Sequence, residues 1–186
     1  MDAEKTIARI LKVNHAGEYG AIRIYRAQLW VARRFQPDLA SFLSETLAHE
    51  VDHCRRFREA MTTHRSRPCR AMWLWSTGGI VLGLATALMG RNAIMACTAA
   101  VEATVHRHLD EQIDYLTPRD RTLADLIADI RVQEIEHLDF ARSHLRPTGF
   151  SRFLGSLVTT STETVIWLST QGAVSRMKRT LSGKRA

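Results

Sequence analysis

The stretch His49-Glu50-Val51-Asp52-His53 decides how this chain folds, because it recurs 84 positions later as Gln133-Glu134-Ile135-Glu136-His137. In each copy, a Glu-x-x-His pair places both side chains on one face of a helix. A further glutamate precedes each pair by the same 32 residues, Glu18 in the first copy and Glu102 in the second. One Glu from each of two helices and a Glu-x-x-His from each of two others form the ligand set of carboxylate-bridged di-iron bundles. The repeat therefore predicts one shared metal site with these ligands: Glu18, Glu50, His53, Glu102, Glu134 and His137.

The rest of the chain indicates an all-α fold. Sustained alternation of apolar and polar residues, which marks half-buried strands, does not occur in the sequence. Apolar residues instead recur at spacings of three and four over residues 3–35, 38–64, 91–116 and 119–145, which predicts four bundle helices. All six candidate ligands fall on these apolar stripes. We therefore expect a ferritin-like four-helix bundle with an internal two-fold repeat, as a single domain over residues 1–186.

Placing glutamates on a stripe that faces the core has an energetic consequence. An isolated buried charge is unfavourable by several kcal/mol at least unless it is paired or bound to metal. Four such carboxylates without cations would mostly have to be protonated, whereas two divalent ions neutralise all four. Iron and manganese suit an oxygen-rich site with two imidazoles, and a redox-active iron pair can activate O2.

Two apolar segments lie outside the predicted bundle helices, at residues 71–90 and 150–175. The first has no formally charged residue over twenty positions, long enough to span a bilayer. A single crossing, however, would separate the two halves of the metal site. We therefore predict interfacial helices that associate with a membrane. The alternative is that both segments complete the bundle core.

Composition narrows the possible partners. A net charge of +7 suits an anionic membrane surface or nucleic acid, or it reflects basic residues that only solvate exposed faces. Aromatic residues interleaved with basic ones are sparse, so we expect no nucleic-acid partner. The three cysteines show no C-x-x-C pattern, which fits a reducing compartment, and the N-terminus has no signal-peptide layout. Together with the predicted interfacial helices, this leads us to expect a peripheral protein on the cytoplasmic face of the cell membrane.

Four motifs resemble a known family: HAGEYGA at residues 15–21, EVDH at 50–53, ACTAAVE at 96–102 and EIEH at 134–137. They are similar to those of the flavin-free di-iron demethoxyubiquinone hydroxylases of ubiquinone biosynthesis. The resemblance implies a ferritin-like bundle that binds two iron ions and uses O2 and an external reductant. It also implies hydroxylation of the polyprenyl quinol 2-polyprenyl-3-methyl-6-methoxy-1,4-benzoquinol at a membrane surface. One departure is visible, because Ala103 and Leu109 stand where the family often has an acidic residue and a tyrosine.

The resemblance further implies a role for each ligand. Glu18 and Glu102 would be terminal ligands, Glu50 and Glu134 bridging ligands, and the two histidines nitrogen ligands. Assembly into a ubiquinone-biosynthesis complex or a homo-oligomer is left open.

Other functions and site residues also remain open at this stage. A ferritin-like protein that oxidises or stores iron, or a peroxidase-type di-iron protein, would use the same ligands, although the peroxidase type normally needs a cysteine metal knuckle. A basic membrane-binding or nucleic-acid-binding protein with a vestigial site would bind no metal. Around the site, His108 could reach the rim, and Asp52, Glu136 and Asp139 could orient the ligand histidines or simply be solvated. For Tyr25, ordinary packing is the favoured interpretation.

Overall fold

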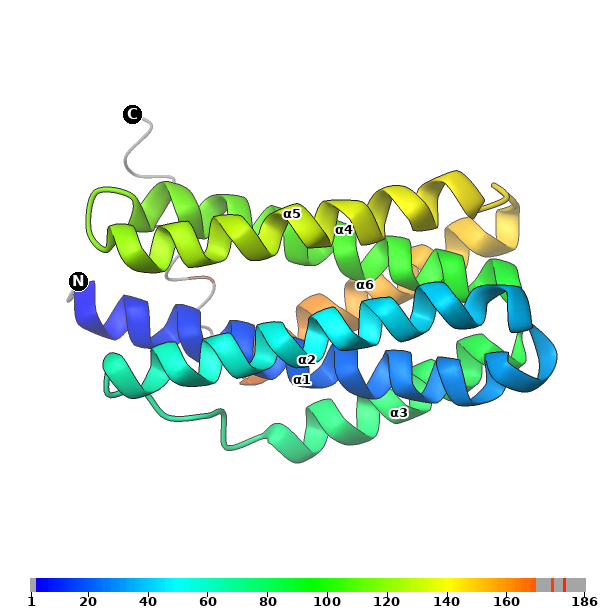
Figure 1. The fold of residues 1–186 in the computed structure, drawn as a ribbon, viewed down its shortest axis with the longest axis horizontal. Coiled ribbons are helices and arrows are strands. Elements are labelled where there is room, and N and C mark those ends of the chain that lie inside the picture. Colours follow the sequence, from blue (N-terminus) through cyan, green and yellow to red (C-terminus); the bar gives the residue numbers. More distant parts are fainter. Residues whose placement is uncertain (1–2, 170–174, 176–178, 180–186) are drawn as a thin grey trace.

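The computed structural model describes residues 3–169 together with residues 175 and 179. Within residues 3–169 the chain forms six α-helices and one short 3-10 helix, with no strand (Figure 1). The elements are α1 (Ala3–Phe35), η1 (Pro37–Leu39), α2 (Ala40–Thr63), α3 (Met72–Leu88), α4 (Arg91–Leu116), α5 (Arg121–His144) and α6 (Gly149–Ser169). The expected all-α fold is confirmed. The predicted apolar segment 150–175 corresponds to α6 up to Ser169, and residues 170–174 lie outside the described part.

Two antiparallel helical hairpins, α1–α2 and α4–α5, make up the bundle. Pro37 lies in the first turn of η1, where proline's missing N–H leaves no hydrogen bond unmade. Asp120 caps α5, because its side chain accepts a hydrogen bond from the backbone N–H of Leu123. Gly90 has φ +96° at the start of α4, a conformation that side chains disfavour. The first two connections keep the helices of each hairpin side by side, and Gly90 joins α3 to α4.

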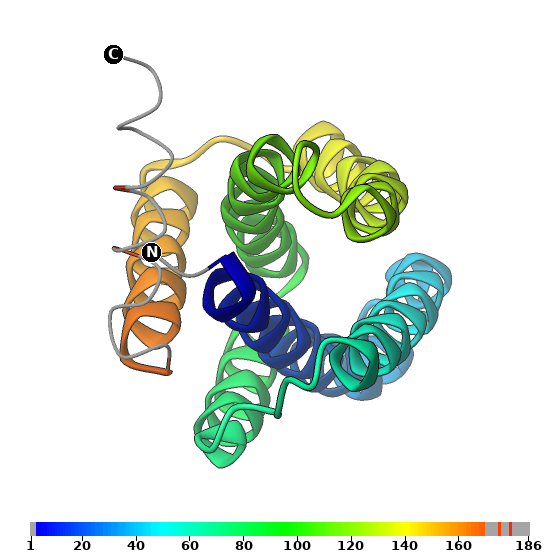
Figure 2. The ribbon, with the colours of Figure 1, turned by 90° about the vertical axis from the view of Figure 1, so that its left-hand side faces the viewer.

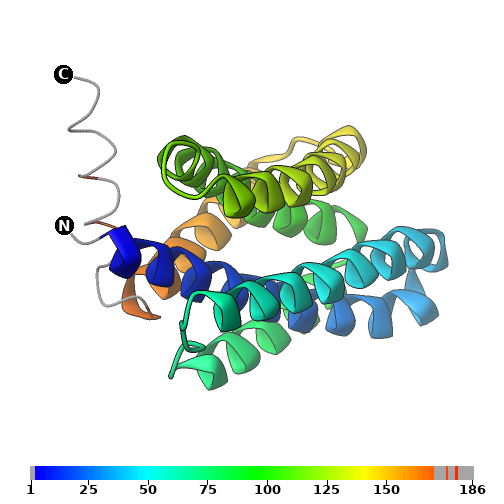
Figure 3. The same cartoon turned by 60° about the vertical axis from the view of Figure 1, so that its left-hand side comes forward.

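Seen end-on, α2 and α5 face one another on one side of the bundle, and α1 and α4 lie beside them (Figure 2). The α6 helix lies beside α4 on the side away from α5, and α3 lies beneath α1. Figure 3 shows the same arrangement obliquely, with α3 under α1 and α6 beside α4. The four bundle helices thus surround the centre, and the two apolar helices cover only the α1–α4 side.

The α3 helix packs tightly on α1 through two glycines. A Cβ atom on Gly79 would lie 2.6 Å from the carbonyl oxygen of Gly20, and one on Gly83 would lie 2.5 Å from that of Ile24. Because real Cβ atoms do not approach so closely, both positions require glycine for this helix–helix distance. The inner face of α3 therefore belongs to the core.

The outer faces of α3 and α6 remain apolar and exposed. Trp73 on α3 is 68% exposed, and Phe153 and Trp167 on α6 are 66% and 53% exposed. Each helix therefore contributes to the core through its inner face and presents apolar surface on its outer face. Association of these helices with a membrane stays a prediction. Among the described residues, no helix combines the length and the apolar character needed to cross a bilayer.

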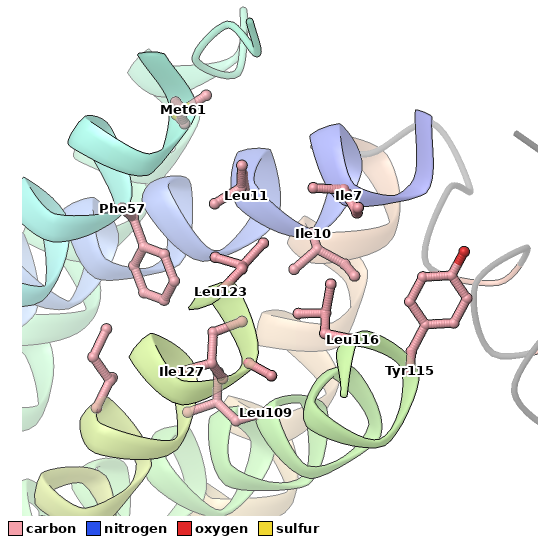
Figure 4. Close-up of a cluster of buried hydrophobic side chains, with 12 residues drawn as sticks. Ile7, Ile10, Leu11, Phe57, Met61, Leu109, Tyr115, Leu116, Leu123 and Ile127 are labelled. Atoms are coloured by element: carbon pink, nitrogen blue, oxygen red, sulfur yellow. The ribbon is translucent and has the colours of Figure 1, made fainter. Parts of the chain in front are cut away.

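The apolar core is divided into two main layers at opposite ends of the bundle. One layer joins the start of α1, the end of α2, the end of α4 and the start of α5, with Phe57, Leu116 and Ile127 at its centre (Figure 4). The other layer lies around Tyr25, Leu43 and Met95 at the opposite end. Buried polar side chains occupy the layer between them, and the candidate ligands lie there.

Candidate metal centre

The structure brings all six sequence-predicted ligands together from four helices. Glu18 comes from α1, the first Glu-x-x-His pair from α2, Glu102 from α4 and the second pair from α5. None of the six side chains is more than 5% exposed. The helical spacing of three residues points Glu and His of each pair into the same interior layer, as the 84-residue repeat predicts.

The six residues form two overlapping groups, each with one ligand-type atom per residue and all atoms within 4.8 Å of one another. One group holds Glu18 and His53, and the other holds Glu102 and His137. Glu50 and Glu134 belong to both groups. The two oxygens of Glu134 lie near different imidazoles, one 3.0 Å from His53 Nδ1 and the other 3.7 Å from His137 Nδ1. The geometry is therefore that of two overlapping groups of ligand-type atoms that share two carboxylates and could hold a metal ion.

Burial and crowding of the carboxylates perturb their protonation. Burial, and then the charge of Glu134, raise the pKa of Glu50 and Glu102 well above the ordinary value. Burial would also raise the pKa of Glu134, but the nearby imidazoles of His137 and His53 hold it well below the ordinary value. Burial disfavours the charged form of His53, yet the carboxylates of Glu134 and Glu18 raise its pKa to about 10. Burial thus favours the protonated form of Glu50 and Glu102, and the neighbouring carboxylates favour the protonated imidazole of His53.

Several polar atoms in this layer have no hydrogen-bond partner within the described part of the chain. They are Glu50 Oε1, both carboxylate oxygens of Glu134, and the Nδ1 atoms of His53 and His137. Unpaired buried polar atoms are costly, and here they converge on the same two positions. Carboxylate oxygens and imidazole nitrogens are ligands for divalent transition ions, so these residues could bind a metal ion.

Neighbouring side chains hold the candidate ligands. Tyr25, fully buried on α1, donates a hydrogen bond from its hydroxyl to the carboxylate of Glu102. Across the contact between α2 and α5, His49 Nδ1 lies 3.0 Å from His137 Nε2, and Gln133 Oε1 lies 2.6 Å from His53 Nε2. Because Tyr25 donates this hydrogen bond to Glu102, the interpretation of Tyr25 as ordinary packing is wrong.

The acidic residues that could have oriented the histidines do not reach them. Asp52 pairs with Arg55 at 2.6 Å on the surface, and Glu136 and Asp139 are exposed. One signal in the sequence marks the residues that do reach them: His49 and Gln133 occupy equivalent positions of the repeat, each directly before a candidate bridging glutamate.

A largely apolar pocket of about 380 Å³ leads to this site from the α3–α6 side. All of the glutamate ligands line its inner end: Glu18, Glu50, Glu102 and Glu134. Its walls come from α1, α3, α4 and α6, including Ile24, Leu82, Val101 and Leu157. His108 also lines the pocket and lies 3.4 Å from Glu163 of α6. The volume is in the range of small-molecule sites, and the lining suits an apolar ligand.

The fold and the site together define a ferritin-like helical bundle with a buried carboxylate–imidazole centre and an apolar access pocket. Residues 5–169 match the family model described as "Ubiquinone biosynthesis protein COQ7". The chain belongs to this family.

Curated relatives agree with this assignment. The chain is 40% identical to the human "NADPH-dependent 3-demethoxyubiquinone 3-hydroxylase, mitochondrial" over 74% of this chain and 64% of the human protein. It is 35% identical to the Rhodospirillum rubrum "3-demethoxyubiquinol 3-hydroxylase" over 88% of this chain and 77% of that protein. A Dictyostelium discoideum relative with the same name as the human protein is 35% identical over 89% of this chain and 77% of its own length. The chain spans just under two thirds of the length of the mammalian relatives that it matches.

Proposed function

We propose that this protein is a di-iron monooxygenase that uses O2 to hydroxylate 2-polyprenyl-3-methyl-6-methoxy-1,4-benzoquinol in ubiquinone biosynthesis. The observation that carries the proposal is the apolar pocket that ends at the carboxylates of the candidate metal centre. A protein that only oxidises or stores iron has no need of such a pocket. The names of the human and Rhodospirillum rubrum relatives specify hydroxylation of demethoxyubiquinone or demethoxyubiquinol.

Each ligand has a role in this proposal. Glu18 and His53 would hold one iron, Glu102 and His137 would hold the other, and Glu50 and Glu134 would bridge them. The membership of the two groups supports these roles, because only the last two carboxylates belong to both. Two imidazoles among carboxylates suit iron better than zinc. Bound iron would supply the one-electron chemistry with O2 that side chains lack.

The chain itself would bind and orient the substrate. The apolar pocket walls, which include residues of α3 and α6, would exclude water around the quinol ring and contact the polyprenyl tail. The exposed aromatic residues on both helices would rest on a membrane surface, where such a tail is dissolved. Peripheral attachment at the cytoplasmic face, and assembly with other biosynthetic proteins or with further copies of the chain, stay predictions. The human relative's name specifies NADPH, which is the reductant we would try first.

Product analysis tests the reaction. The purified protein is loaded with Fe²⁺ anaerobically, then mixed with the quinol, a reductant and ¹⁸O2, and the product is identified by mass spectrometry. We expect a product that carries one labelled oxygen atom, and no product from the metal-free protein. Oxidation of Fe²⁺ without quinol turnover would refute the proposal and favour a ferritin-type activity.

Vesicle binding tests the membrane surface. Phe153→Asp should weaken sedimentation with vesicles that contain anionic lipid, because the charge replaces an exposed apolar side chain on α6. Val132→Asp is the matched control, since Val132 is 56% exposed but lies on α5, away from α3 and α6. If both variants lost vesicle binding equally, or if neither lost it, attachment through the exposed faces of α3 and α6 would be contradicted.

A further inference from the structure

Each ligand histidine is held from the opposite half of the repeat. The residue directly before Glu50 reaches from α2 to the histidine of α5, with His49 Nδ1 3.0 Å from His137 Nε2. The residue directly before Glu134 reaches back from α5 to the histidine of α2, with Gln133 Oε1 2.6 Å from His53 Nε2. The two contacts are equivalent under the internal repeat, but one partner is an imidazole and the other an amide.

These contacts decide which ring nitrogen of each histidine faces the carboxylates. An amide oxygen can only accept a hydrogen bond, so His53 must carry its proton on Nε2 and donate it to Gln133. Nδ1, 3.0 Å from Glu134 and 3.7 Å from Glu18, is then the nitrogen that offers a lone pair once the imidazolium of the metal-free protein gives up its second proton. A metal ligand needs such a lone pair.

The same logic applies to the other histidine. His137 Nδ1 lies 3.7 Å from both Glu50 and Glu134. To offer a lone pair there, His137 must carry its proton on Nε2 and donate it to Nδ1 of His49. His49 must therefore accept at Nδ1, the same task that the amide oxygen of Gln133 performs in the other half.

We propose that His49 and Gln133 are positioning residues that fix the tautomer and ring orientation of the two metal-ligating histidines, each serving a different metal position. The inference rests on the proposed di-metal function and adds the groups that prepare its nitrogen ligands. His49 would serve the metal ion held by Glu102 and His137, and Gln133 would serve the metal ion held by Glu18 and His53.

A purely architectural role makes a different prediction. Other side chains also join α2 to α5: Phe42 stacks on Phe140 with ring centroids 3.9 Å apart, and His64 Nε2 lies 2.6 Å from Asp120. If His49 only joined the helices, its removal would resemble the loss of His64, which contacts neither of the ligand histidines. His64, the residue directly after α2, is thus the control for a role that is only architectural.

Titration with Co²⁺ alone tests the proposal in the full chain, by calorimetry and by the visible spectrum of bound cobalt. The variants are His49→Ala, His49→Gln, Gln133→Ala and His64→Ala. Loss of a partner that orients a metal-binding histidine typically lowers metal affinity about 10- to 100-fold. We expect His49→Ala and Gln133→Ala each to lower the affinity for one of two Co²⁺ ions by that factor. The two variants should change different bands of the visible cobalt spectrum. His49→Gln should restore binding, because it copies the amide of the other half.

The outcomes separate the possible failures. His64→Ala should lower thermal stability and leave both Co²⁺ affinities unchanged. Two outcomes would overturn the positioning role and leave the proposed metal site intact. The first is a His49→Ala variant that circular dichroism shows to be folded and that binds two Co²⁺ ions as tightly as the unaltered protein. The second is a His49→Gln variant that binds Co²⁺ as weakly as His49→Ala. If the unaltered protein bound no Co²⁺, the proposed function would fail together with this inference.

Discussion

Replacing Glu50 with glutamine should have opposite effects on the metal-free and metal-bound protein. Glu50 is 1% exposed and lies in both candidate cation groups. Burial and the charges of Glu134 and Glu18 raise its pKa well above the ordinary value of 4.5. Between pH 4.5 and its raised folded-state pKa, the metal-free folded protein therefore holds Glu50 protonated, whereas the unfolded chain leaves it ionised. Glutamine keeps the shape of the protonated acid and has no proton to take up.

The magnitude follows from proton linkage. A carboxyl whose pKa is raised by folding contributes its full stability below pH 4.5, and this contribution is lost as the pH rises toward the folded-state value. Between these two pKa values the loss has a slope of about 1.4 kcal/mol per pH unit. Glu50→Gln removes this slope and should stabilise the metal-free protein by about 1.4 kcal/mol for each pH unit above 4.5 within that range.

Metal binding should respond in the other direction. Three carboxylates cannot neutralise two divalent ions, and an uncompensated buried charge costs about 3–5 kcal/mol. Since a tenfold change in affinity corresponds to about 1.4 kcal/mol, Co²⁺ should bind about 10²- to 10⁴-fold more weakly to the Glu50→Gln variant.

Two measurements check these effects. Urea unfolding with a chelator between about pH 5.5 and 7.5 gives the slope, and calorimetric titration with Co²⁺ gives the affinity. Glu45→Gln, an exposed glutamate on the same helix, is the control and should change neither. A Glu50→Gln variant with the pH slope of the unaltered protein would show that Glu50 is not protonated in the fold. Unchanged Co²⁺ affinity would show that Glu50 is not a ligand.

Three further outcomes are expected. Tyr25→Phe removes the hydrogen bond to Glu102, and because such bonds to charged groups contribute about 1.5–3 kcal/mol, calorimetry should show Co²⁺ affinity lower by about 10- to 100-fold; unchanged affinity would make Tyr25 a packing residue after all. Gly83→Ala should lower the free energy of unfolding by about 1–3 kcal/mol because the new methyl collides with α1, whereas Gly78→Ala, with open space around its Cβ, should be neutral or stabilising; equal effects would contradict the close α1–α3 packing. Loading with Co²⁺ at neutral pH should release protons, since despite its burial the neighbouring carboxylates raise the pKa of His53 to about 10; binding heats that do not depend on the ionisation enthalpy of the buffer would refute this.

Local patterns along the chain specify the helical fold and the candidate ligands. Apolar spacings of three and four residues specify a helix and its buried face, and both are local properties of the chain. The 84-residue repeat adds that Glu18 and Glu102, like the two Glu-x-x-His pairs, occupy equivalent positions. Since buried glutamates need compensating charge, that pattern predicts a shared centre before any contact is known.

Which side chains surround those ligands depends on contacts between helices that are far apart along the chain. Tyr25 contacts Glu102 of α4, and His49 and Gln133 each serve the histidine of the other half, although these partners lie 77 to 88 positions apart along the chain. The apolar pocket likewise exists only because α3 and α6 pack on the α1–α4 side. Helical periodicity states which face is buried, but the partner across an interface depends on how whole helices dock, which no local pattern encodes.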